Sequence, residues 1–164
     1  MASSLYDISV TSFLQILDAL GTVLDKGAAH CADNGIDPDS LLAQRIAEDM
    51  LPLSFQLHMA TVHTTGSLDA IRAGETEPSG GIPELSYTGF RERLAESAAS
   101  LRELGEDDVN GLAGQRLVFR VGGVSHFPGT TVNARLVTTL RQCTWSVTSR
   151  VGIGNGHQRY DECR

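Results

Sequence analysis

Apolar residues recur at helical spacing along the N-terminal part of the chain. Between about Ser4 and Asn34 they follow steps of three and four, which is typical of one face of an amphipathic helix. The positions that carry this pattern are Phe13, Leu14, Leu17, Leu20 and Leu24. Gly35 follows the segment, where a glycine commonly ends a helix. The pattern therefore predicts a long first helix.

A short helix and a second long helix are predicted next. Asp37 is placed to cap the short helix, and Pro38 would open it without losing a hydrogen bond. Its inward side chains are expected to be Leu41, Leu42 and Ile46. From Pro52 to about Ala73 the sequence predicts one continuous helix with two apolar stripes, and such a helix usually packs between neighbours.

A third long helix is predicted from near Thr88, after a loop rich in glycine, proline, serine and acidic residues. Its apolar side follows a seven-residue repeat, as in an antiparallel bundle. The repeat is carried by Phe90, Leu94, Ser97, Leu101 and Leu104. The outer side carries charges that we interpret as a solvated surface, namely Arg91, Glu92, Arg93 and Glu96.

Alternation of apolar residues then replaces the helical period. The stretch Leu117–Phe127 has two glycines at its middle, and hairpin turns need the positive φ that glycine adopts easily. We predict a two-stranded hairpin there. From Val132 to Val151 helical spacing returns, but the stretch is rich in threonine and valine, each roughly a few tenths of a kcal/mol worse than alanine in a helix. The last helix is thus poorly encoded, and the divergent segment 132–164 fits a disordered tail.

Length and charge exclude several classes of protein. With 164 residues and no internal repeat, the chain is expected to form one domain over 1–164. A net charge of -7 without a basic stripe argues against nucleic acid and anionic membranes as partners, because phosphate contacts dominate such binding. No apolar run approaches the ~20 residues of a membrane span. Since signal-peptide features and zinc-type cysteine motifs are also missing, we expect a soluble, cytoplasmic protein.

Several N-terminal motifs resemble a known family. The stretches are LYDISVTSFLQILDALGTVLDKGAAH, GIDPDSLLAQRIAEDMLPLSFQ and the VGG of the hairpin. Together they are similar to the domain-of-unknown-function family 1993, within the DinB/YfiT-like group, over about residues 3–131. The resemblance implies an all-α, up-and-down four-helix bundle with a small hairpin before the last helix. It implies no activity, because the family has no function to carry over.

The C-terminal third departs from the family pattern. Members of the family carry a fourth long helix with a histidine and several aromatic residues, whereas here Trp145 is the only aromatic of the matching stretch. We hypothesise a frameshifted, mis-spliced or truncated gene product after about Thr131. A weak fourth helix would leave one side of the Pro52–Ala73 helix exposed, so we predict a homodimer or an unstable monomer.

Two histidines on the second long helix, His58 and His63, are the first candidates for a functional site. They are five residues apart, so on a helix they point about 140° away from each other. Two histidines that share a metal fit a spacing of four better. The simpler interpretation is therefore two histidines at helix interfaces with satisfied hydrogen bonds. The neighbouring acids Glu48 and Asp49 are a further candidate, as an acid–base pair.

The resemblance adds a metal hypothesis. DinB-like bundles that hold a metal take one ligand from the second long helix and two, spaced four apart, from the fourth. This implies His63 as a ligand, with His58 as the substitute. His126 or His157 would have to be recruited from other segments, because no His-x-x-x-His follows residue 126. The metal would be divalent zinc or nickel, although the incomplete ligand set favours no cofactor.

Two classes of function follow from these observations. The lack of a complete catalytic constellation in the sequence favours a non-catalytic bundle protein for binding or assembly, with an unknown small-molecule ligand. The alternative is a metal-dependent DinB-like enzyme, a transferase that acts on a thiol or another small nucleophile. That alternative rests on analogy of fold, and a fold does not determine a function. The sequence leaves open whether the chain is an enzyme.

Overall fold

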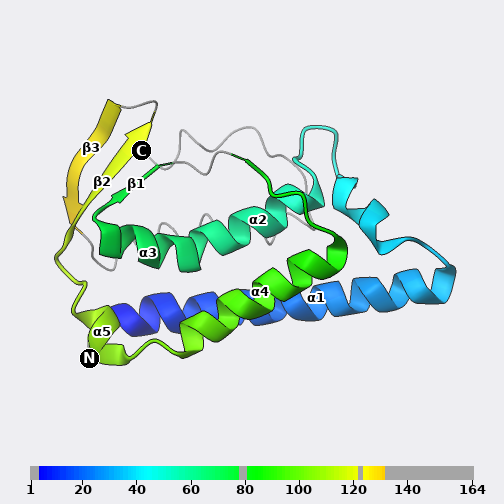
Figure 1. Cartoon of the computed structure of the whole chain (residues 1–164), viewed down its shortest axis with the longest axis horizontal. Coiled ribbons are helices and arrows are strands. Elements are labelled where there is room, and N and C mark those ends of the chain that lie inside the picture. The colour runs from blue at the N-terminus through cyan, green and yellow to red at the C-terminus, as the bar shows by residue number, and fades with distance from the viewer. Residues whose placement is uncertain (1–3, 78–80, 122–123, 132–164) are drawn as a thin grey trace.

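Helices make up most of the computed structural model, which describes residues 4–77, 81–121 and 124–131. Figure 1 shows α1 and α4 side by side, with α2 and α3 following one another alongside them. The helices are α1 (Ser12–Asn34), α2 (Leu53–His63), α3 (Thr65–Ala73), α4 (Tyr87–Arg102) and α5 (Glu106–Asn110), with π-helical turns at Asp7–Thr11 and a 3-10 helix at Pro38–Ala43. This confirms the mainly helical fold class. The last helix predicted from Val132 to Val151 lies outside the described residues.

The first helix confirms the apolar pattern from which it is predicted. Four of the pattern's leucine and phenylalanine side chains are buried, namely Phe13, Leu17, Leu20 and Leu24. Gly35 ends the helix at φ 64°, a left-handed conformation that glycine adopts without the crowding of a Cβ. At the other end, the backbone N–H of Tyr6 donates to Oδ1 of Asn110 at 3.0 Å, which ties the start of the chain to α5.

Tyr87, the first residue of α4, joins three elements. Its hydroxyl donates to the Leu24 carbonyl of α1 at 2.8 Å, and its backbone N–H donates to Oδ1 of Asp39 at 2.6 Å. Burial, the main cause, raises the pKa of its phenol. Gly27 permits this approach, because a Cβ at that position would collide with the Tyr87 hydroxyl. Tyr87 therefore fixes the positions of α1, α4 and the 3-10 helix relative to one another.

The 3-10 helix confirms the short helix predicted after Gly35. Asp37 caps it as expected, since its carboxylate accepts from the Asp39 N–H at 3.1 Å. Leu41 and Leu42 pack against the core, but Ile46 lies beyond the end of the helix and is 56% exposed. The prediction of an inward Ile46 is wrong because the helix ends at Ala43.

The second long helix is broken at Thr64, whereas the sequence predicts one continuous helix from Pro52 to Ala73. Thr64 adopts φ -99° and ψ -88°, outside the helical region. Its hydroxyl donates to the Ala60 carbonyl at 2.8 Å, and that of Thr65 donates to the Thr61 carbonyl at 3.2 Å. Such side-chain bonds compete with the backbone ladder for carbonyl groups and bend or break helices. The prediction of continuity is wrong for this reason.

A small three-stranded sheet lies at one end of the described structure (Figure 1). Its strands, in spatial order, are β1 (Glu75–Thr76), β2 (Arg116–Val121) and β3 (Val124–Thr131). The antiparallel pairing of β2 with β3 confirms the hairpin predicted at Leu117–Phe127. β1 pairs with β2 in parallel, although the sequence predicts a loop there. Next to this pairing, the Val118 N–H donates a hydrogen bond to the Gly74 carbonyl, at 2.9 Å, directly after the end of α3.

One segment is long and apolar enough to cross a membrane by length and composition. It is Asp7–Asn34, with a mean hydropathy of 1.3, so the expectation that no apolar run approaches this length does not hold. Its buried side chains, however, belong to the core shared with α4. Its Asp18 and Asp25 also pair with Arg102 and Arg91 of that helix. We therefore interpret it as the core helix of the bundle.

Candidate functional site

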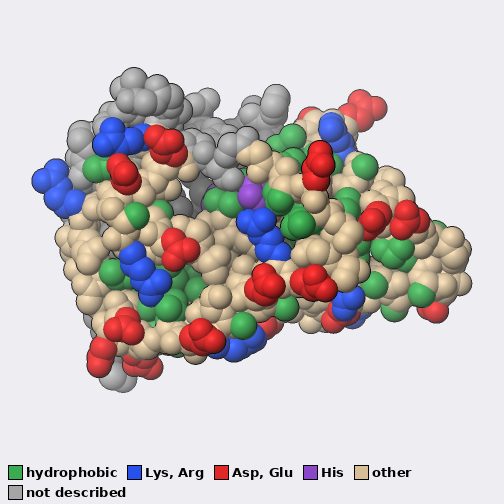
Figure 2. Space-filling view, viewed as in Figure 1, with side chains coloured by type: hydrophobic (Ala, Val, Ile, Leu, Met, Phe, Trp, Pro, Cys, Tyr) green, Lys and Arg blue, Asp and Glu red, His purple; other side chains and the backbone are tan. Residues whose placement is uncertain are grey.

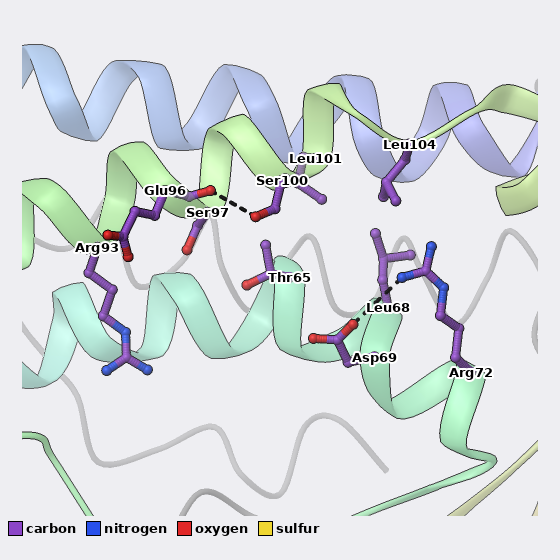
Figure 3. A pocket seen from close by; sticks show the side chains of 10 residues that line it. All are labelled: Thr65, Leu68, Asp69, Arg72, Arg93, Glu96, Ser97, Ser100, Leu101 and Leu104. Carbon is purple, nitrogen blue, oxygen red and sulfur yellow. Dashed lines mark hydrogen bonds and ion pairs between the residues drawn. The ribbon is translucent and has the colours of Figure 1, made fainter.

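A cleft of about 390 Å³ lies between α3 and α4 (Figure 3). Its ten lining residues are Thr65, Leu68, Asp69 and Arg72 of α3, Arg93, Glu96, Ser97, Ser100 and Leu101 of α4, and Leu104 just beyond α4. Small-molecule sites commonly enclose ~300–1,000 Å³ and combine apolar walls with a few polar groups. This cleft has the size and the mixed lining of such a site.

Helical period and side-chain size together create the cleft. The lining positions of each helix follow steps of three and four, so each set forms one face. Leu68 and Leu101 are almost fully buried, with 2% and 1% of their surfaces exposed. Near the middle, Thr65 and Ser97 extend from opposite walls, as Figure 3 shows. Their small side chains leave space between helices that larger residues would fill.

Charged side chains occupy both ends of the cleft. At one end Arg72 and Asp69 form an ion pair along α3, with Nη1 and Oδ1 3.6 Å apart. At the other end Arg93 is half-buried and makes no hydrogen bond or ion pair with the residues that the structure describes. Its side chain extends from α4 toward α2 (Figure 3). Between the ends, the Ser100 hydroxyl donates to the Glu96 carbonyl at 3.0 Å.

His58 lies close enough to Arg93, at one end of the cleft, to be affected by its charge, and His63 lies close to His58. His58 is buried. Its burial, and to a smaller extent the positive charge of Arg93, lowers its pKa below 6.5. Burial also lowers the pKa of His63, and the proximity of His58 adds to that effect. Both imidazoles are therefore neutral at neutral pH. Nδ1 of His63 is buried without a hydrogen-bond partner within the described part of the chain, so the prediction of satisfied hydrogen bonds is wrong for this atom.

Of the three predicted metal ligands, the structure describes the side chains of His58 and His63, so their meeting with His126 stays a prediction. His58 and His63 lie on α2 at a spacing of five residues. His126 lies within β3, but its side chain is outside the description, and His157 lies wholly outside it. Among the described side chains, no three histidine, cysteine, aspartate or glutamate residues form a group suited to a metal ion. Two imidazoles alone do not fit the donor set of a metal centre.

The acid–base candidates, Glu48 and Asp49, lie on the loop between the 3-10 helix and α2. Both side chains are exposed, and neither lines the cleft. Acid–base catalysis depends on side chains held in a sheltered site beside the substrate. The structure therefore does not favour this pair as the functional site.

The cleft itself is missed by the sequence analysis. Arg93 and Glu96 are interpreted there as solvated surface, whereas both line the cleft. One signal was present: Ser97 occupies an apolar position in the seven-residue repeat of α4. A small residue in such a position leaves room against the facing helix. The sequence does not show which helix faces Ser97. This position therefore predicts a gap in the packing of α4 but does not locate the cleft.

The surface around the cleft carries charges of both signs. Figure 2 shows acidic and basic side chains intermixed over this face, with a histidine visible next to basic side chains. This face is therefore not uniformly acidic, although the chain carries a net charge of -7. A local basic group such as Arg93 can act on a ligand at short range, because salt screens exposed charges beyond about 10 Å.

A comparison with family models matches residues 5–139 to the family described as Domain of unknown function (DUF1993). The match spans most of the chain. The chain belongs to this family. The matched region extends slightly past residue 131, where the resemblance of the sequence motifs is expected to end. A comparison with functionally curated proteins finds no match.

Among solved structures, the chain is similar to a DinB family member protein from Shewanella denitrificans. The TM-score is 0.62, and the match covers 95% of this chain and 90% of that chain at 20% sequence identity. At this level of identity the likeness shows the fold alone. It confirms the DinB-like fold that the sequence motifs imply. The family's description names no function, so the proposal below rests on the site.

Proposed function

We propose that this DUF1993 protein is a small-molecule-binding bundle protein, with the α3–α4 cleft as its binding site. The observation that supports this most strongly is the cleft's lining, in which hydroxyl and charged side chains surround an apolar floor formed by Leu68 and Leu101. Polar groups placed around an apolar surface fix the orientation of a ligand while the apolar surface supplies affinity. The family match and the DinB-like fold are compatible with this function but do not specify it.

Binding without catalysis is the form of the proposal that the lining supports best. The described lining residues include no histidine, cysteine or lysine, which are common bases and nucleophiles in enzymes. The hydroxyl of Ser100 already donates to a backbone carbonyl, which engages its proton. The Thr65 hydroxyl likewise donates to the Thr61 carbonyl, at 3.2 Å, so Ser97 is the lining residue whose hydroxyl proton is not engaged among the described residues. Together with the two arginines and the two carboxylates, Ser97 is suited to hydrogen bonds with a ligand.

A fragment screen observed by NMR tests this proposal. Ser97→Leu should fill the cleft and abolish the chemical-shift changes that bound fragments cause in α3 and α4. Ala99→Leu is the matched control, because Ala99 is exposed on the same helix and does not line the cleft. Fragments that bind with equal affinity to both variants, or that perturb only other parts of the protein, would show that the cleft is not the binding site.

A metal-dependent DinB-like enzyme is the second candidate function. The observation that favours it is the buried Nδ1 of His63, which has no hydrogen-bond partner among the described residues, beside a second neutral imidazole on His58. Neutral imidazole is the form that binds metals. The test is the metal content of the purified, tag-free protein by mass spectrometry. Near-stoichiometric zinc or nickel that His63→Ala removes would support an enzyme, and no metal in either protein would count against it.

The homodimer and the cytoplasmic location remain predictions. In the described residues, large exposed apolar side chains occur at Val23, Ile36, Ile46, Leu51 and Ile82, and none of these lies on α2. The exposed α2 stripe from which a dimer is expected is therefore not seen in this part of the chain. Size-exclusion chromatography with light scattering would decide the oligomeric state, and a stable soluble monomer would contradict the prediction.

A further inference from the structure

Arg93 differs from the other arginine of the cleft. Arg72 has Asp69 as its ion-pair partner, so a carboxylate already lies beside its guanidinium. Arg93 is half-buried and makes no hydrogen bond or ion pair with the described residues, Glu96 one turn further along α4 included. A guanidinium offers five N–H donors in a planar fork that matches a carboxylate or phosphate group. Arg93 is thus available to an anion in the cleft.

The remainder of the cleft limits the body of such a ligand. Figure 3 shows Thr65 and Ser97 between the Arg93 end and the Arg72 end, with Leu68, Leu101 and Leu104 beyond them. Leu68 and Leu101 are almost fully buried beneath the cleft, so the half-buried Leu104 offers most of the apolar surface. The Arg72–Asp69 pair closes the far end with no net charge. The lining therefore complements a molecule with one anionic head and a short apolar body better than it complements a molecule with two anionic ends.

Resting on the proposed binding function, we propose that the α3–α4 cleft binds a small carboxylate whose head group is held by Arg93 and whose short apolar body lies mainly against Leu104, above the buried Leu68 and Leu101. Ser97, whose hydroxyl makes no hydrogen bond with the described residues, supplies a donor between Arg93 and the leucines. A carboxylate with one negative charge is favoured over phosphate because Glu96 and Asp69 also line the cleft. Their charges repel a doubly charged head group more strongly than a singly charged one.

Three ligands with the same alkyl body test the head group. The full-length protein is titrated with hexanoate, hexanamide and monohexyl phosphate, and binding is followed by NMR chemical-shift changes in α3 and α4. Hexanoate should bind about tenfold more tightly than hexanamide, because charge-assisted hydrogen bonds to arginine are lost with the amide. Arg93→Gln should lower the affinity for hexanoate about tenfold and leave that for hexanamide nearly unchanged. The matched control is Arg102→Gln, on the same helix but outside the cleft lining, which should change neither affinity.

The outcomes separate the failure of this inference from the failure of the proposed function. Equal affinities for hexanoate and hexanamide, both unchanged by Arg93→Gln but lost in Ser97→Leu, would leave the binding function and overturn the carboxylate site. Tighter binding of the hexyl phosphate than of hexanoate would also overturn the carboxylate assignment. If no ligand or fragment perturbs α3 and α4, both proposals are wrong.

Discussion

Helix α4 packs differently on its α1 side and on its α3 side. Toward α1, its exposed arginines have carboxylate partners: Arg91 pairs with Asp25, and Arg102 pairs with Asp18 at 2.6 Å. Toward α3, Arg93 has no partner among the described residues, and a cleft separates the two helices. The α1 side of α4 therefore resembles an interface within the fold, whereas its α3 side resembles a surface that is available to a ligand.

Side-chain size explains much of this difference. The core between α1 and α4 contains bulky residues that are nearly fully buried, including Phe13, Leu17, Phe90 and Leu94. The facing sides of α3 and α4 instead carry Thr65 and Ser97 at their middle. Close packing needs side chains that fill the space between two helices, and small polar residues do not fill it. The same amphipathic helix can therefore stabilise the fold on one side and expose functional groups on the other.

The largest expected effect is on the α1–α4 side. Phe90→Ala should lower the free energy of unfolding by about 3–5 kcal/mol, because Phe90 is 1% exposed and its removal leaves a cavity. Ser97→Ala on the cleft side should change it by less than about 0.5 kcal/mol. Urea denaturation of the two variants measures both values. Equal losses would show that the two sides are packed alike.

A smaller loss is expected where Tyr87 crosses α1. Gly27→Ala should cost about 1–3 kcal/mol, since the new methyl group would collide with the Tyr87 hydroxyl. Gly21→Ala is the matched control: its added Cβ meets no other atom within 4 Å, so better helix propensity should stabilise the protein by up to about 1 kcal/mol. Thermal unfolding would measure both changes. Tyr87→Phe should relieve part of the loss in Gly27→Ala, and a failure to do so would contradict the proposed collision.

Acidification should lower the free energy of unfolding, because burial holds the two histidines of α2 in their neutral form. The folded-state pKa values of His58 and His63 lie below 6.5, so the unfolded chain binds more protons in the range between those values and 6.5. The free energy of unfolding should therefore fall as the pH drops below 6.5, and level off below the folded pKa values. Urea denaturation on both sides of pH 6.5 measures this fall.

Substitution of both histidines provides the control for that pH dependence. His58→Gln with His63→Gln should reduce the fall in stability, because neither position then takes up a proton. His30→Gln should leave it nearly unchanged, since His30 is exposed on α1. The same pH dependence in the double variant as in the natural protein would place its origin elsewhere.

Removal of single arginines should have less effect on stability. Arg102→Gln should cost at most about 1 kcal/mol, because it breaks an ion pair between exposed side chains. Arg93→Gln should cost even less, since it removes no ion pair seen in the described residues. Urea denaturation at low and high salt would separate the two variants. A larger loss for Arg93→Gln would indicate that this side chain stabilises the fold.

The smallest expected effect is on the pKa of one histidine. Arg93→Gln should raise the pKa of His58 toward 6.5, because the Arg93 charge is one of the two causes that lower it. The increase should be partial, since burial is the larger cause and remains. NMR titration of the histidine ring protons would measure it, with Arg102→Gln as the control. An unchanged pKa would mean that Arg93 does not lie close to His58 in solution.

Local signals in the sequence were sufficient to predict most helices and the hairpin. The spacing of Phe13, Leu17 and Leu24, the stop at Gly35 and the cap at Asp37 all act within a few residues of the chain. Ser86, whose hydroxyl accepts from the Gly89 N–H at 3.1 Å, caps α4 within one residue of its predicted start. Such features depend on neighbours in sequence, and a periodic pattern therefore reveals them.

The break at Thr64 was within reach of the sequence but was outweighed by the apolar pattern around it. The stretch TVHTTGS contains four hydroxyl side chains and a glycine, each of which weakens a helix. The apolar stripes continue across it from Leu57 to Leu68 and Ile71. The spacing of apolar residues indicates which side of a segment is buried. The same spacing is found whether the segment forms one continuous helix or two successive helices.

Sequence alone determined the family, the helical fold and the positions of both histidines. Only the tertiary structure decided that β1 pairs with β2 and that Arg93 lines a cleft opposite Thr65 and Arg72. The reason is physical: a cleft is the space left between two helices, and its shape depends on how distant segments are held. Here the Tyr87 hydrogen bond and the apolar core around Phe13 and Phe90 hold α4 against α1, and the small side chains facing α3 leave the cleft open.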